Sequence, residues 1–347
     1  MNPEFHFFMH GPIAQAELAH QWHSTGQPRW RQQLYAVERR VGLALALILY
    51  GGELAGALLR RDPTPIGETL GFAATLLVIF TGLYHFLLMF RTLALGANSI
   101  TREKTGKTWE MLVLTGVDAR QIVWGKWWAT VLRQWRQYAL LGVLRAGVIA
   151  WLGGSASRIL ASIYTSYGYT YGDLQTVLPS ALDVLAAGLV VFLLTLANLG
   201  FTAACGVLAS SETRSGALAL ARAVATRLTI LFVALMILML PSVILDLAGW
   251  WLDRVQLGSN FSLMDVLSRT SITLLDNGAS LGSELVAYRL GNTSGSTPSA
   301  LAAAILSLAI YGVMTWGLLR MAQRRAVRHL ALPPEENKPA NHITKRL

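Results

Sequence analysis

Apolar residues in this 347-residue chain gather into six stretches, each close to the roughly 20 residues that a helix needs to cross the hydrocarbon core of a membrane. Polar and charged residues are concentrated between these stretches. The pattern therefore predicts an all-α integral membrane protein with six transmembrane helices. The six stretches are residues 41–59, 70–90, 128–151, 182–209, 228–252 and 300–319.

The third stretch is the weakest, because Arg133, Arg136 and Arg145 interrupt it. We retain it as a span because the basic segments on its two sides would otherwise fall on opposite faces of the membrane. Composition supports a membrane protein: 53% of the residues are hydrophobic and only 14% are charged, against about 25% charged in soluble domains. The single cysteine, Cys205, excludes an intramolecular disulfide and a cysteine-based zinc site.

The net charge of +10 is unevenly placed along the chain. Basic residues are concentrated in 29–40, 91–126, 214–227 and from 320 onward, which are the termini and alternate loops. Positive loops tend to stay on the cytoplasmic side, so we expect a plasma-membrane protein with both termini in the cytoplasm. Because orientation accounts for most of the basic excess, no nucleic-acid partner is expected.

Three regions follow from this pattern: an N-terminal cytoplasmic segment (1–40), a six-span transmembrane domain (41–319) and a basic, partly disordered cytoplasmic tail (320–347). In the first region, apolar residues recur at helical spacing beside arginines, which indicates an amphipathic helix lying in the membrane interface. A plain cytoplasmic extension is the alternative. The apolar positions are Trp30, Leu34, Val37 and Val41.

The cytoplasmic loop between the second and third spans, residues 98–126, reads as two short helices separated by a turn. Thr115 and Gly116 end the first helix, and Asp118 can cap the second. Such a loop is suited to docking on another protein, or alternatively to packing on its own bundle. The run 105–108 imitates a phosphate-binding loop, but Thr101 stands where the motif needs glycine, so we expect no ATP binding by this chain.

The run SITREKTGKTWEMLVLTGVDARQIVWGKWWA resembles the signature of type-2 permease subunits of ATP-binding-cassette transporters. Thr108 is displaced by one position from the family pattern, and Lys107 and Gly116 replace the residues common there. The matching positions are Glu103, Lys104, Gly106, Thr108, Glu110, Leu112, Leu114, Thr115, Gly125 and Lys126.

The resemblance implies a permease of the cell membrane, by family expectation an exporter, that has no catalytic residue, cofactor or metal of its own. A separate cytosolic ATPase subunit would bind ATP, and residues 98–126 would form a cytoplasmic coupling helix seated in that subunit. A second permease chain, identical or homologous, would complete the transporter. The expected contacts with the ATPase are Glu103, Lys104, Gly106, Thr108, Trp109, Glu110, Leu112 and Thr115.

Within the spans, two ionisable residues need an explanation because a charge at mid-membrane is costly. Glu53 lies about 18 Å into the first span at 1.5 Å per residue, and Arg145 has a similar expected depth in the third. We expect them to form an intramembrane pair, with a polar translocation path as the alternative. His85 is expected to be a hydrogen-bonded core histidine, and residues 253–299 form the longest external segment.

Two other classes of function compete with a transporter. One is a non-transporting membrane sensor or assembly partner that uses the same fold and ATPase. The other is a membrane-embedded enzyme acting on lipid carriers, which would need converging acids, bases, metals or nucleophiles. The sequence shows no such cluster within the spans, and it does not identify a cargo.

Overall fold

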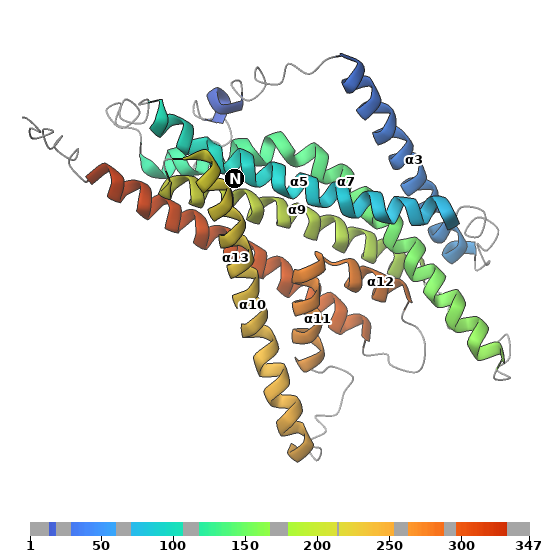
Figure 1. Cartoon of the computed structure of the whole chain (residues 1–347). Helices are drawn as coiled ribbons and strands as arrows, with labels where there is room; N and C mark the ends of the chain where they lie inside the picture. The colour runs from blue at the N-terminus through green and yellow to red at the C-terminus, as the bar shows by residue number, and fades with distance from the viewer. Residues whose placement is uncertain are drawn as a thin grey trace, which may run out of the picture.

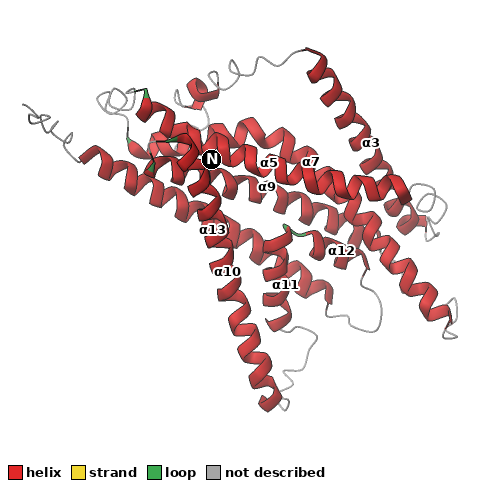
Figure 2. Cartoon of the chain, in the orientation of Figure 1, coloured by secondary structure: helices red, strands yellow, loops and turns green. Residues whose placement is uncertain are grey.

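The computed structural model describes residues 14–18, 29–59, 71–106, 118–166, 180–213, 215–252, 263–287 and 296–331. These residues are almost entirely helical and contain no strand (Figure 2). The helices are α3 (Arg29–Leu59), α5 (Gly71–Thr105), α7 (Ala119–Ser166), α9 (Ala181–Glu212), α10 (Gly216–Leu252), α11 (Leu263–Asp276), α12 (Ala279–Ala287) and α13 (Ser296–Ala331).

Six of these helices are long and apolar enough to cross a membrane, as the hydrophobic pattern predicted. They are α3, α5, α7, α9, α10 and α13. Side chains on their outer faces are large and apolar; on α5, Leu76, Ile79, Leu83 and Leu87 recur at helical spacing and are all more than half exposed. In water such a surface would be unfavourable, so it is suited to contact with lipid. The fold is that of a multi-pass membrane protein.

Helix α9 forms the centre of the bundle. Figure 1 shows it running between α5 and α7 on one side and α13 on the other, and α10, α12 and α3 also pack against it. Its sequence explains this position, because it lacks charged residues between Asp183 and Glu212 and is rich in small ones. A helix that is apolar all round is buried by its neighbours.

Glycines allow α5 and α9 to approach until their backbones touch. A Cβ atom added at Gly96 would lie 3.0 Å from Cα of Gly206 and 3.1 Å from the carbonyl oxygen of Ala203. Small residues at helix contacts are typical of membrane proteins, where close packing replaces the hydrophobic driving force. Elsewhere on α9, Gly188 makes room for the ring of Tyr50, whose hydroxyl donates a hydrogen bond to the Val184 carbonyl at 3.0 Å.

Two helices differ in extent from the sequence prediction. The segment expected to form an interfacial helix before residue 41 is the first part of α3, which continues without a break to Leu59. The second short helix expected in the loop 98–126 is the start of α7, which runs for 48 residues. At 1.5 Å per residue α7 is about 72 Å long, so it extends well beyond the thickness of a bilayer.

The segment 253–299, expected as an external loop, contains a helical hairpin. Helices α11 and α12 are joined by Asn277 and Gly278, whose φ angles of 55° and 87° make a tight left-handed turn. The Asp276 carboxylate accepts the backbone N–H groups of Gly278, Ala279 and Ser280 and so caps α12. At 14 and 9 residues, both helices are too short to span a membrane.

The contact between α5 and α9 generates a matched test. Replacing Gly96 with Val should push the two backbones apart and lower the free energy of unfolding by about 1–3 kcal/mol, the usual cost of overpacking. Gly82→Val, in the same helix, is the control, because a Cβ at Gly82 meets nothing within 4 Å. Thermal unfolding of the detergent-solubilised protein measures both; equal stability of the two variants would contradict the close contact.

Candidate functional site

A buried lysine joins the two ends of the loop 98–126. Lys126, in the second turn of α7, is fully buried, and its Nζ lies 2.5 Å from Oε1 of Glu103, 3.2 Å from Oε2 of Glu17 and 2.9 Å from the carbonyl oxygen of Ser99. Ser99 and Glu103 are four residues apart and so share one face of α5 near its end. We call these four residues, Glu17, Ser99, Glu103 and Lys126, the loop base.

The charges of the loop base are balanced when its neighbour Arg102 is included. An ammonium group buried without a partner would cost several kcal/mol, and here three oxygens surround it. Arg102 adds a second cation, with Nη2 at 3.1 Å from Oε2 of Glu17. Two carboxylates and two cations therefore hold the ends of α5 and α7 and the segment 14–18 together.

Lys104 extends this connection to α9. Its Nζ donates to the carbonyl oxygen of Ser211 at 2.5 Å, one residue before α9 ends at Glu212. The last carbonyls of a helix have no partner within it, and a cation there also interacts favourably with the helix dipole. Glu212 in turn forms ion pairs with Arg222 of α10 and Arg325 of α13. Polar contacts at this end of the bundle thus connect five helices.

Three of the residues expected to contact an ATPase lie in the described part of the chain. Within this chain the Glu103 side chain is 16% exposed and contacts Lys126, and the Lys104 ammonium contacts the end of α9. Gly106 is exposed at the end of α5. The other five lie outside the described residues: Thr108, Trp109, Glu110, Leu112 and Thr115.

The expected cap at Asp118 is confirmed. Its Oδ1 accepts the backbone N–H of Arg120 at 3.2 Å, and its carbonyl accepts that of Ile122 at 3.2 Å. An aspartate whose side chain satisfies an early N–H group of a helix is a typical N-cap. The cap fixes where the loop ends and α7 begins, eight residues before Lys126.

The expected pair of Glu53 and Arg145 is not what the structure shows. Glu53 lies against Gly154, and its Oε1 is 3.0 Å from Nη1 of Arg158. Ala46 lies against Gly147, so a step of seven residues along α3 matches seven along α7. This parallel register places Glu53 nine residues, or about 13 Å, beyond Arg145 on α7. Depth in the sequence could not give the register between the two helices.

Arg145 instead holds the turn of the hairpin. It donates to the carbonyl oxygen of Asp276 and, at 3.3 Å, to Oγ1 of Thr195 in the middle of α9. The Tyr311 hydroxyl lies 2.8 Å from Oδ1 of Asn277, and Nδ2 of Asn277 lies 3.4 Å from Nε2 of His85. We call Arg145, Thr195, Asp276, Asn277, Tyr311 and His85 the tip cluster. The hydrogen bond expected for His85 is therefore present.

Each partner in the tip cluster lies near the middle of its spanning helix, so the hairpin turn lies at mid-depth in the bundle. Sequence reasoning missed this arrangement, although the run Asp276-Asn277-Gly278 is a turn signal between apolar segments. The turn signal did not indicate that the turn would be buried inside the bundle.

A second buried arginine was also missed. Arg227 of α10 donates to Oδ1 of Asn198 at 2.8 Å and to Thr202, and its guanidinium lies 5.3 Å from the centre of the Phe201 ring. These partners are all on α9. Among the described residues, neither Arg145 nor Arg227 has a carboxylate within salt-bridge distance; both are satisfied by neutral oxygens.

No protein-family model matches this chain, and no curated protein sequence matches it significantly. The functional argument therefore rests on the residues above and on their geometry.

The loop base generates a double-mutant test. Lys126→Met leaves two buried carboxylates facing each other and should lower the free energy of unfolding by about 3–5 kcal/mol, the typical cost of breaking a buried pair. Adding Glu103→Gln removes one of those charges and should restore part of the loss. Unfolding of the single and double variants in detergent measures the coupling; strictly additive losses would contradict a direct pair.

Proposed function

We propose that this chain is the membrane-spanning permease subunit of an ATP-binding-cassette transporter, driven by a separate cytosolic ATPase subunit that grips residues 98–126. The support comes from three sources. The chain has six helices able to span a membrane, its loop carries the motif residues described above, and two of those residues, Glu103 and Lys126, meet in the loop base.

The single observation that carries the proposal is the buried contact between Glu103 and Lys126. These two residues stand at opposite ends of the motif, 23 positions apart, and their side chains are 2.5 Å apart. A force applied to the segment between them would reach α5 and α7 together. Through Lys104 it would also reach α9, the central helix. A loop segment that is attached to three helices at once would allow an external ATPase to move those helices together.

The free energy required is within the range that an ATPase supplies. Shifting a two-state equilibrium from 1:99 to 99:1 needs a differential affinity of about 5.5 kcal/mol. The carboxylates of the loop base are occupied by Lys126 and Arg102, so the apolar residues Trp109 and Leu112 are the better candidates for the binding energy of the partner. In this proposal Glu103 and Lys104 transmit force, and the segment that follows Gly106 makes the contact.

The proposal includes a second permease chain and a plasma-membrane location with both termini in the cytoplasm. The loop base and the start of α10 share one end of the bundle, because Oδ1 of Asn98 lies against Gly216. The basic segments that flank α5, α9 and α13 are at this end, and this distribution of charge supports a cytoplasmic location for it. Most permeases of the family that the motif resembles export their cargo, and export is the direction proposed here.

Orientation can be tested with two matched cysteines. Ser162, near the end of α7, and Ser215, before α10, are both exposed, whereas the natural Cys205 is fully buried. A membrane-impermeant maleimide added to intact cells should label Ser162→Cys and should label Ser215→Cys only after permeabilisation. The wild-type chain is the control for Cys205. Labelling of Ser215→Cys in intact cells would place the loop base outside and overturn the proposal.

The partner can be tested by photo-crosslinking from position 109. A photoreactive residue in place of Trp109 should crosslink to an ATP-binding protein that mass spectrometry identifies, whereas the same residue at Ser162 should not. Trp109→Ala should weaken co-purification of that protein about 30-fold, as for a tryptophan hot spot worth about 2 kcal/mol. ATP-dependent flux in vesicles then distinguishes a transporter from a sensor. An absence of any ATPase at position 109 would contradict the proposal.

A further inference from the structure

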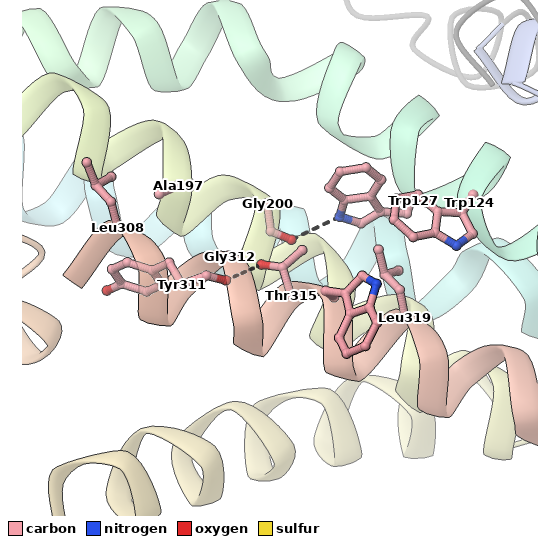
Figure 3. A pocket seen from close by; sticks show the side chains of 10 residues that line it. Trp124, Trp127, Ala197, Gly200, Leu308, Tyr311, Gly312, Thr315 and Leu319 are labelled. Carbon is pink, nitrogen blue, oxygen red and sulfur yellow. Dashed lines mark hydrogen bonds between the residues drawn. The ribbon is translucent and has the colours of Figure 1, made fainter. Parts of the chain in front are cut away.

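An apolar pocket opens between α7, α9 and α13; it is separate from the loop base and shares only Tyr311 with the tip cluster. Its volume is about 310 Å³, at the lower end of the range for small-molecule sites. Figure 3 shows Trp124 and Trp127 on one side, Ala197 and Gly200 at the back, and the α13 stripe from Leu308 to Leu319 on the other side. The small residues of α9 create the hollow, because their side chains do not fill the space between the flanking helices.

Three polar groups on the wall of the pocket are already bonded within the protein. The indole N–H of Trp127 donates to the Gly200 carbonyl at 3.0 Å, and Oγ1 of Thr315 donates to the Tyr311 carbonyl at 2.7 Å, as Figure 3 shows. The Tyr311 hydroxyl is turned away to Asn277 in the tip cluster. These three groups therefore need no hydrogen bond from an occupant, which favours a hydrocarbon chain over a polar molecule.

The length of the pocket matches one leaflet of a bilayer. Leu308 and Leu319 are 11 residues apart, which corresponds to about 16 Å along α13, and half of a typical hydrocarbon core is about 15 Å. Leu308 is close to Tyr311 and the tip cluster at mid-depth, whereas Leu319 is next to the basic end of α13. The pocket thus runs from the middle of the membrane to one interface.

A cation stands at the interfacial end of the pocket. Arg320 is exposed, and its guanidinium lies 4.3 Å from the centre of the ring of Trp316, one of the lining residues. Among the described residues no salt bridge includes Arg320. Arg324 follows one turn later and is also exposed. A planar guanidinium held on an aromatic ring at the level of the headgroups is well placed to bind a phosphate.

We propose that this pocket binds one acyl chain of an anionic membrane phospholipid, whose phosphate contacts Arg320. The hydrocarbon chain lies against Gly312 and the three tryptophans, and the headgroup stays at the interface. This lipid site is independent of the ATPase partner, so it can hold whether or not the chain is a transporter.

Filling the pocket gives a matched pair of variants. Gly312 lines the pocket, whereas Gly317 lies on the opposite side of α13, outside the pocket. A Cβ added at either glycine meets nothing within 4 Å. Gly312→Leu should therefore fold and occupy the hollow, and Gly317→Leu is its control. Native mass spectrometry of the purified full chain, titrated with phosphatidylglycerol, should show a tightly retained lipid on the wild type and Gly317→Leu, and loss of that lipid on Gly312→Leu.

The headgroup contact is tested by Arg320→Gln with two lipids of the same chain length. The wild type should retain phosphatidylglycerol more strongly than phosphatidylcholine, and Arg320→Gln should reduce this preference about fivefold, or about 1 kcal/mol, the value of one basic residue at an anionic surface. Equal retention by wild type and Gly312→Leu would overturn the site. An unchanged lipid preference in Arg320→Gln would also overturn it. A third contradicting result is that Gly312→Leu dissociates a dimer and leaves the bound lipid unchanged.

Discussion

The structure depends on one constraint: a cationic side chain buried in an apolar bundle must find its partner inside that bundle. Lys126 meets this constraint with two carboxylates and a carbonyl, and in doing so it ties α5 to α7. Arg145 meets it with the turn of the hairpin, and Arg227 with the amide and hydroxyl oxygens of α9. Desolvated charges are costly to leave unpaired, so each of these contacts fixes a helix in one place.

The central helix α9 makes these contacts compatible with close packing. Gly206 lets α5 touch its backbone, and Gly200 leaves the pocket that faces α13. On its other faces Asn198 and Thr195 supply the oxygens that satisfy the two buried arginines. One helix therefore supplies both the contact surfaces and the polar partners. Because Ser211 and Thr195 lie on this same helix, α9 connects the contact of Lys104 to the tip cluster. This arrangement gives the proposed coupling a physical route from one end of the bundle to its middle.

The sequence predicted the parts of the fold that depend on length and local composition. The six spans, the cap at Asp118 and the hydrogen-bonded His85 agree with the structure, because each follows from residues that are close in sequence or from burial alone. The hairpin was missed, since two helices of 14 and 9 residues resemble an external loop when they are judged by their length. For the loop 98–126 the sequence identified the motif, but not that Glu103 turns inward to Lys126.

What the sequence determined by itself is that this chain is helical and has six segments able to cross a membrane, because the hydrocarbon core sets the length and polarity of any helix that crosses it. Only the tertiary structure decided which charges meet. Glu53 pairs with Arg158 and not with Arg145, because the contacts of Ala46 with Gly147 and of Glu53 with Gly154 set a parallel register between α3 and α7. Such a register is a property of two packed surfaces, and it is not encoded in the depth of either residue along its own helix.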